Sequence, residues 1–538
     1  FTLDMTLIPD FGEARSDNQV LNLSPFEVQF DENRAFFTEG VELFNKGSFF
    51  YSRRIGGTPL RHYEVEDELG ANDTLLSNPA RTQLINASKI SGRTESGLGI
   101  GVFNAVSART VARIADRENL DQVRELETSP LTNYNVFVLD QNLKNNSYVS
   151  FVNTNVWRSG TAYDANVTGT VFNLRNKQNS YAIGGRGAVS QLYFSDSTGL
   201  GHKYLLSLSK TSGKFTFEFY YNEESDTYDP NDLGFLFNNN ERSAGFNFNY
   251  NQYEPFGIYN EGGFGAWMGY ERLYAPSVFA NFNVNVWGWL VQKNFFAYGM
   301  WADVQPALAY DYFEPRVAGR YFTQVVNGAS GVWISSDYRK KFALDMEVAY
   351  RKFDEPGRQI ATIDFNPRYR FSDRFSMQLG LSNYYWFNDV GYVTNPSDAE
   401  IIFGRRDRVQ FVNTINASYT FTNNMILTFR LRHYWQGVEY RGFYDLLPNG
   451  GLQDKDYNEF SDRSFNSFNI DAIYRWRFAP GSDFFVIWKN SILGEGNELD
   501  NISYDYGRGF GQLFELPQRN SLSLKLIYYL DYLQFKRR

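Results

Sequence analysis

Apolar and polar residues alternate along this chain from one end to the other, and this period of two limits the possible folds more than any other feature. In residues 245–251 aromatic residues take every second position and asparagines fill the gaps; residues 281–286, 427–432 and 468–477 repeat the pattern. No run approaches the roughly 18 apolar residues of a membrane-spanning helix. Because a strand sends successive side chains to opposite faces, each segment would have one apolar and one polar face. The pattern predicts many strands in one closed sheet.

The composition of the two faces indicates which solvent each one meets. Aromatic residues make up 18% of the chain, with 37 Tyr, 49 Phe and 10 Trp. This bias is typical of the aromatic belts at the two interfaces of a membrane. The opposite face carries more Asn, Arg, Asp and Glu than a dry core could hold unpaired. We therefore predict an all-β fold, a large transmembrane antiparallel β-barrel of roughly 22 to 26 strands, surrounded by outer-membrane lipid and enclosing a wet lumen.

Length, charge and cysteine content narrow the remaining classes. The 538 residues contain no Pro/Ser-rich linker, which suits one large barrel better than soluble domains of roughly 100–200 residues. The formal net charge of −9 provides no basic surface for nucleic acid. Cysteine is absent, so disulfides, thiolate metal sites and cysteine nucleophiles are excluded. Residues 1–7 already alternate, so we expect the chain to begin inside a strand, with further residues before Phe1.

Residues 1–80 differ from the rest of the chain. Residues 9–56 hold no period of two, and they combine charged and aromatic residues at a density that suits neither lipid nor a regular strand. We predict that residues 1–80 contain the start of the barrel and a plug folded into its lumen, and that residues 81–538 form the transmembrane barrel with long extracellular loops. The candidate loops are the polar stretches 223–242, 388–408 and 445–463.

Charged residues of the predicted plug form the candidate functional site: Glu27, Glu32, Arg34, Glu39, Arg53 and Arg54. They could line a constriction and select solutes by charge, as rings of charged side chains do in channels. Alternatively, they lock the plug to charged residues of the lumen wall, for which the candidates are Asp345, Glu347, Asp364, Arg368, Arg370 and Arg430. Large barrels often contain such plugs, so we favour the lock.

Patterns for catalysis, cofactors and metals are weak. The histidines, His62, His202 and His433, lack the spacing of metal ligands. The glycines of residues 97–101 precede no helix, so nucleotide binding is disfavoured; alternate glycines on one strand face predict instead that another segment approaches closely from the lumen. The acidic groups within 226–232 and 454–459 suit solvated loops better than calcium sites. We expect no catalytic residue, no cofactor and no metal.

The first 56 residues resemble the start of the barrel region in a family of Gram-negative outer-membrane proteins of unassigned function. The matching motifs are LD at 3–4, PDF at 9–11, FE at 26–27, Glu32, Arg34, FF and EG within 36–40, and FYSRRIG at 50–56. Ile8 and Ala35 depart from the family pattern, which has Asn and Pro there. Members of this family often carry an N-terminal module similar to a family 9 carbohydrate-binding domain, which these residues do not include. The resemblance implies a barrel and a link to glycans.

Three functions are compatible with these expectations. The favoured one is a plugged barrel that serves as an accessory or structural component of an envelope complex, or whose outer loops bind partner proteins. The alternative is a passage barrel for a solute such as a glycan fragment. An embedded hydrolase would need catalytic residues that the sequence does not offer.

Overall fold

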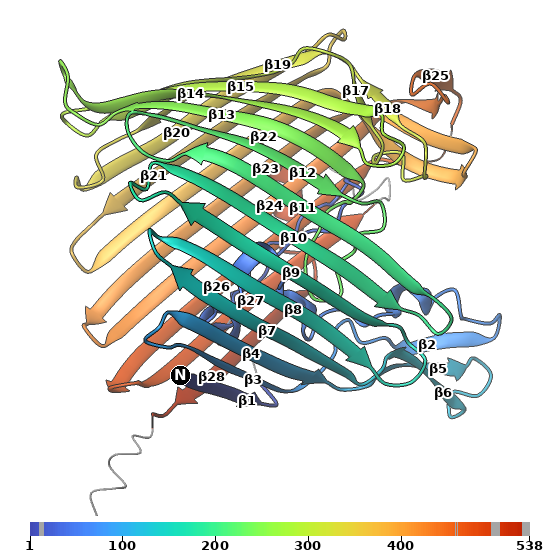
Figure 1. The fold of residues 1–538 in the computed structure, drawn as a ribbon. Coiled ribbons are helices and arrows are strands. Elements are labelled where there is room, and N and C mark those ends of the chain that lie inside the picture. Colours follow the sequence, from blue (N-terminus) through green and yellow to red (C-terminus); the bar gives the residue numbers. More distant parts are fainter. Residues whose placement is uncertain (10–14, 458, 460, 497–505, 530–538) are drawn as a thin grey trace, which may run out of the picture. The chain divides into compact units, whose positions relative to one another are not determined.

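The structure, a computed structural model, describes residues 1–9, 15–457, 459, 461–496 and 506–529. An antiparallel sheet of 23 strands dominates it, accompanied by a three-stranded and a two-stranded sheet (Figure 1). The predicted all-β fold with a large antiparallel sheet is therefore confirmed, and its strand number lies within the expected range. No helix among the described residues is long and apolar enough to cross a membrane.

The contacts within the chain define two compact units. The first comprises Phe1–Phe11, Phe26–Phe246 and Glu271–Val278, and the second comprises Gly12–Pro25, Asn247–Tyr270 and Phe279–Arg538. Two strands, β13 (Glu241–Gln252) and β14 (Tyr259–Leu273), contribute residues to both units.

The strands of the first unit's large sheet pair antiparallel in chain order, and a small sheet takes β2 from between β1 and β3 and β5 and β6 from between β4 and β7. They are β1 (Thr2–Leu7), β3 (Leu84–Arg93), β4 (Leu98–Ser107), β7 (Thr132–Leu143), β8 (Ser147–Arg158), β9 (Asp164–Arg175), β10 (Tyr181–Tyr193), β11 (Thr198–Lys210) and β12 (Phe215–Glu224). The small sheet contains β2 (Asp73–Ser77), β5 (Thr110–Asp116) and β6 (Val123–Ser129). The helical turns are α1 (Ala35–Thr38), η1 (Lys46–Ser48), η2 (Ser52–Arg54) and η3 (His62–Glu64).

Connections in the first unit differ in length between the two ends of the strands. One end carries the short turns 94–97, 144–146, 176–180 and 211–214. The other carries the β5–β6 hairpin and the loop 225–240 beside the short connections 159–163 and 194–197. Asn145, Asn146 and Asn179 have positive φ in these turns, a conformation that asparagine tolerates better than most residues. β1 begins at the short-turn end, because Thr2 pairs with Ser91.

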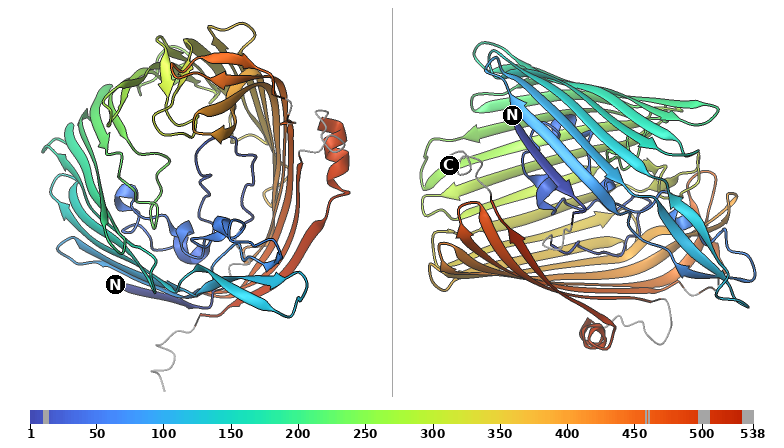
Figure 2. Two further views of the ribbon diagram at one scale, coloured as in Figure 1. Left: turned by 90° about the vertical axis from the view of Figure 1, so that its right-hand side faces the viewer. Right: turned by 90° about the horizontal axis from the view of Figure 1, so that it is seen from below.

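Both faces of the first unit's sheet are apolar where β7 and its neighbours lie, but only one of them is covered. On β7, Val136 and Val138 are buried, whereas Phe137 between them is 38% exposed. The buried face packs beneath residues 26–56, which we call the N-terminal segment and which Figure 2 shows in blue against these strands. Leu206 and Leu208 of β11 are also exposed, like Phe137.

Strands of the second unit also pair antiparallel with one another. Its strands are β15 (Phe279–Gln292), β16 (Ala297–Gln305), β17 (Ala309–Asp311), β18 (Phe322–Gln324), β19 (Asn327–Ser335), β20 (Phe342–Phe353), β21 (Gln359–Arg370), β22 (Phe375–Ser397), β23 (Glu400–Thr422), β24 (Met425–Leu446), β25 (Leu452–Lys455), β26 (Arg463–Ala479), β27 (Ser482–Gly496) and β28 (Gln518–Ile527). The helix α2 (Tyr506–Leu513) precedes β28.

The expected loop at 388–408 is wrong, because these residues extend β22 and β23. Their charges pair within the sheet: the Asp389 carboxylate lies 3.2 Å from Arg406 Nε and 3.1 Å from Arg408 Nη1. Apolar residues between them, including Ile401 and Phe403, are buried. A stretch rich in charge can therefore remain a strand when its partners lie on the neighbouring strand.

Residues 15–25 lie on one face of the second unit, and α2 lies on the other. Leu21 packs with Tyr434 and Val438 of β24. His433, the neighbour of Tyr434 on the same strand, points the opposite way, and its Nδ1 lies 3.2 Å from the hydroxyl of Tyr506 in α2. Successive strand residues thus reach different partners on the two sides of the sheet.

Candidate functional site

The N-terminal segment is irregular, and the sheet beneath it supplies the partners for its backbone. Lys89 of β3, which is buried, donates from Nζ to the carbonyl of Phe36 at 2.6 Å and also to that of Glu39. These carbonyls belong to the last turn of α1 and to the residue that follows it, where helical hydrogen bonds end. A cation at this position satisfies them and fixes the turn to the sheet.

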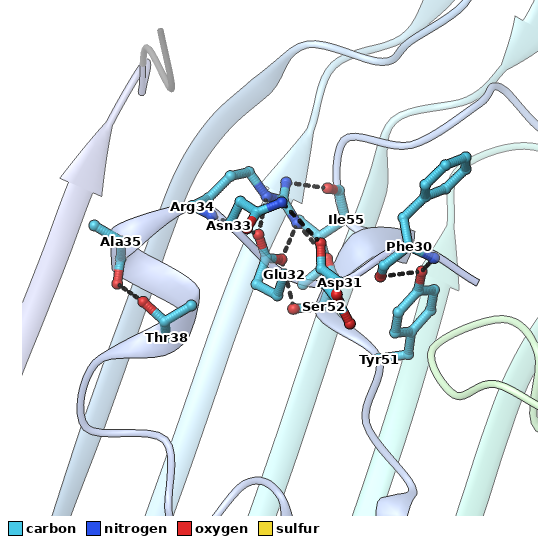
Figure 3. A network of polar contacts seen from close by, with 10 residues as sticks. All are labelled: Phe30, Asp31, Glu32, Asn33, Arg34, Ala35, Thr38, Tyr51, Ser52 and Ile55. Atoms are coloured by element: carbon cyan, nitrogen blue, oxygen red, sulfur yellow. Dashed lines mark hydrogen bonds and ion pairs between the residues drawn. The ribbon is translucent and has the colours of Figure 1, made fainter. Parts of the chain in front are cut away.

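The centre of the segment is a hydrogen-bonded network around Arg34 (Figure 3). Arg34 Nε and Nη2 donate to the two Glu32 carboxylate oxygens at 2.8 and 2.6 Å. The same guanidinium donates to the carbonyls of Ile55 at 2.9 Å and Ser52 at 2.8 Å. The Ser52 hydroxyl donates to Glu32 at 2.6 Å. This bidentate pair joins the first part of the segment to its end, and Arg34 is only 7% exposed.

The charge state of Glu32 follows from these contacts. Burial alone would raise its pKa, but the hydrogen bonds and the charge of Arg34, together with the Ser52 hydroxyl, outweigh that effect and lower the pKa of Glu32 below its usual range. Glu32 is therefore ionised at neutral pH, as a salt bridge with Arg34 requires.

A second ion pair connects the segment to the loop 225–240. Arg54 Nη1 and Nη2 donate to the two Glu27 carboxylate oxygens, both at 2.9 Å, and Arg54 Nε donates to the carbonyl of Gly234 at 3.1 Å. The amide of Tyr51 donates to the carbonyl of Leu233 at 2.7 Å. This loop therefore folds back onto the N-terminal segment.

The expectation that the acidic residues of 226–232 form solvated loop charge is wrong for Asp232. Its carboxylate pairs with Arg158, and both side chains are less than 10% exposed. The Tyr163 hydroxyl donates to the same carboxylate at 3.0 Å. The acid thus holds the loop to β8 and to the residues that precede β9.

The six site residues do not form one ring. Glu32 pairs with Arg34 and Glu27 with Arg54, whereas the Arg53 guanidinium lies 5.9 Å from the centre of the Phe30 ring. Glu39 contributes its backbone carbonyl to Lys89. Both ion pairs are thus formed within the N-terminal segment and not with the predicted residues of the lumen wall. Of the lumen-wall candidates, Arg430 contacts residues 15–25, because its Nη2 donates to Asn18 at 2.6 Å.

Sequence reasoning missed a buried ionic cluster around Asp140 of β7. Its fully buried carboxylate accepts from Arg93 Nη2 at 2.5 Å and from the Ser150 hydroxyl at 2.5 Å, and Lys46 Nζ of η1 lies 3.4 Å away. Arg186 of β10 also donates to the carbonyl of Gly47 at 2.8 Å. The signal in the sequence was an acid on the same strand face as Val136 and Val138.

An apolar core binds the N-terminal segment to the sheet. Phe37, Phe44, Phe49 and Ile55 of the segment are buried in one cluster with Phe103, Val136, Val138 and Val152 of the strands. The Phe103 ring lies 6.1 Å from both Phe37 and Phe44 and 5.3 Å from Phe50, measured between centroids. The segment and the strands therefore share a dry interface.

Glycines on the strand face make room for this core, as residues 97–101 predicted. A Cβ on Gly99 would lie 2.9 Å from Leu43 Cδ2, and one on Gly101 would lie 3.2 Å from Phe44 Cε1. On β9, a Cβ on Gly169 would lie 2.6 Å from Phe49 Cζ. The predicted close approach is confirmed, although side chains rather than backbone make the contact.

Comparison with known proteins identifies the family of this chain. A family model described as a domain of unknown function (DUF5916) matches residues 1–538. Among solved structures, the chain is similar to the crystal structure of the ferric citrate transporter FecA in the unliganded form, with 11% identity, a TM-score of 0.35, and coverage of 78% of this chain and 72% of that one. No curated protein matches the sequence.

Proposed function

We propose that this chain, which belongs to the DUF5916 family, is an outer-membrane β-barrel that its N-terminal segment keeps plugged, and that it serves as an accessory or structural component of an envelope complex. The apolar core shared by the segment and the strands carries this proposal. A gate that opens readily would rest on the wall through hydrated polar contacts. Here each buried large side chain would lose about 1.5–3 kcal/mol of burial on release.

Exposed apolar side chains support the membrane location. Within the first unit they include Leu200, Leu206, Leu208 and Phe219, and within the second Val286, Met300, Val332, Leu522 and Leu524. Each alternates along its strand with residues of the other face. Soluble monomers rarely leave so many large apolar side chains uncovered, whereas lipid solvates them.

The strand connections support an orientation in the membrane. In bacterial outer-membrane barrels, short turns face the periplasm and long loops face the outside. The loop 225–240 and the β5–β6 hairpin would then reach the cell surface, where they would meet partner proteins or envelope glycans. Glycan association follows from the family resemblance, in which a carbohydrate-binding module often precedes the barrel.

Reconstitution of the purified chain in planar lipid bilayers tests the plugged state. We expect a baseline close to that of bare lipid, because the segment and the loop 225–240 are tied together over the wall. The rival function, passage of a solute through an open lumen, requires a large steady conductance in the unmodified protein. Observation of such a conductance would overturn the plugged reading.

A pair of substitutions on β15 tests the lipid face. Val286 is 45% exposed, so Val286→Arg should place a charge in lipid and destabilise the inserted protein by about 2–4 kcal/mol if the residue is near the midplane. Asn285→Arg is the matched control, because residue 285 pairs across the sheet with Asp303 and an acid would receive the new charge. Denaturant titration of protein folded into vesicles measures both. Equal losses for the two variants would contradict a lipid-facing Val286.

A further inference from the structure

A cavity of about 330 Å³ lies on the polar face of the second unit, between β21, β22, β23, β24 and β26. It is on the face that residues 15–25 partly cover, and Arg15 belongs to its lining. Its charged lining residues, within the described chain, are Arg15, Arg368, Arg430 and Asp471. The volume matches a small-molecule site rather than a protein contact.

Charge in this cavity is unbalanced toward positive. Asp471 is its one acid among the described residues, and the oxygens of Asp471 accept from the Ser16 hydroxyl at 2.8 Å and the Ser16 amide at 3.3 Å. Arg430 Nη1 stands farther away, at 3.6 Å. Three guanidinium groups against one carboxylate leave a net charge of about +2, which attracts an anion into the cavity.

Arg368 is held in place without using most of its donors. Its guanidinium stacks over the Tyr338 ring at 4.2 Å from the centroid. The described residues give it one hydrogen bond, a long contact of 3.4 Å to the carbonyl of Tyr338. A guanidinium has five N–H donors in a fixed fork, so this arrangement orients the group while leaving donors for a ligand.

Neutral hydrogen-bonding groups line the cavity together with Met377, Ala417, Phe429 and Ile473. They include the side chains of Ser376, Gln378, Asn416 and Ser418. Amides and hydroxyls of this kind suit a ligand that carries hydroxyl groups beside its charge. We infer that the cavity binds a small hydroxylated oxyanion, such as an acidic or phosphorylated sugar, with Arg15, Arg368 and Arg430 on the carboxylate or phosphate and the neutral side chains on the hydroxyls.

Arg430 and Arg368 contact different parts of the protein. Arg430 binds Asn18 and so helps to hold residues 15–25. Arg368 contacts Tyr338 in the turn 336–341, so it does not hold residues 15–25 through these contacts. Replacing Arg368 should therefore weaken ligand binding without loosening residues 15–25. The inference needs the polar face to be in water, as the proposed function has it, but it does not depend on conductance.

Calorimetric titration of the detergent-solubilised full chain tests the inference with three probes: glucuronate, glucose 6-phosphate and glucose. We expect saturable binding of at least one of the two anions and none of glucose. Arg368→Gln should weaken that binding at least about tenfold, because a charge-assisted contact is lost. Arg374→Gln is the charge-matched control, since Arg374 is exposed in the turn 371–374 and lies outside the lining.

The three probes separate the outcomes. Preference for glucuronate or for glucose 6-phosphate identifies the anionic group, and either result supports the inference. Binding of glucose equal to that of the anions, no saturable binding, or the same loss in Arg368→Gln and Arg374→Gln would overturn it. Thermal unfolding of each variant checks that the protein is intact. Conductance in the unmodified protein would refute the plugged state but would not contradict ligand binding in the cavity.

Discussion

Joint replacement of Phe44 and Phe49 by alanine should make the barrel, which we propose to be plugged, conduct ions. Both rings are almost fully buried, Phe44 against Phe103 and Phe49 against Gly169. Removing a buried phenylalanine ring costs about 3–5 kcal/mol, partly because the cavity cannot collapse fully. With both rings removed, the N-terminal segment would be dissociated from the strands for much of the time. The measurement is steady current through planar bilayers. We expect it to rise more than about tenfold, because each loss of about 1.4 kcal/mol in the stability of the bound segment increases the released fraction about tenfold.

The matched control removes two rings from the other face of the same wall. Phe137 of β7 and Phe151 of β8 are 38% and 37% exposed, and their ring centroids lie 6.5 Å apart. Their double alanine variant deletes equal bulk without touching the segment, so its current should stay at the baseline. Conductance that rises equally in both double variants would indicate general damage to the barrel rather than loss of a plug.

The second large effect concerns the buried ion pair. Arg34→Ala would remove the cation that pairs with the Glu32 carboxylate and the guanidinium donors to the carbonyls of Ser52 and Ile55, at a cost of about 3–5 kcal/mol. Amide hydrogen exchange over residues 51–55 should then accelerate roughly a hundredfold or more, since local opening becomes that much easier. Adding Glu32→Gln to Arg34→Ala should recover part of the loss, because the uncompensated buried charge disappears.

Arg54→Ala provides the contrast for this measurement. Its partner Glu27 has a side chain that is 57% exposed, and ion pairs in contact with solvent contribute about 0–1 kcal/mol. Exchange at residues 51–55 should therefore accelerate less than about tenfold in this variant. Equal acceleration in Arg34→Ala and Arg54→Ala would show that burial does not distinguish the two pairs.

The strands were predictable because a period of two is a local property of the sequence. Residues 245–251 and 281–286 lie within β13 and β15 as expected. The ends of β22 and β23 were not, since the charges of Arg406 and Arg408 suggest solvent until Asp389 is placed across the sheet. The length of a strand therefore depends on charge pairs with the neighbouring strand, which cannot be read from one segment of the sequence.

The candidate site was predictable in its residue types but not in its partners. Arg34 and Arg54 do form salt bridges, but with Glu32 and Glu27 of the same segment. The contacts of the segment with the wall, such as Lys46 with Asp140, join residues far apart along the chain. Their proximity is a product of the sheet register, which the alternation pattern alone does not specify.

The pairing of β1 with β3 has a consequence for how such a barrel could ever open. β1 precedes the N-terminal segment and β3 follows it, and their register from Thr2↔Ser91 to Leu7↔Asn86 closes the chain between them into a loop fastened at both ends. A domain on a single tether can be pulled out whole. Because both of its ends continue into paired strands, this segment would stay attached to the wall as a loop even after its contacts with the apolar core were broken.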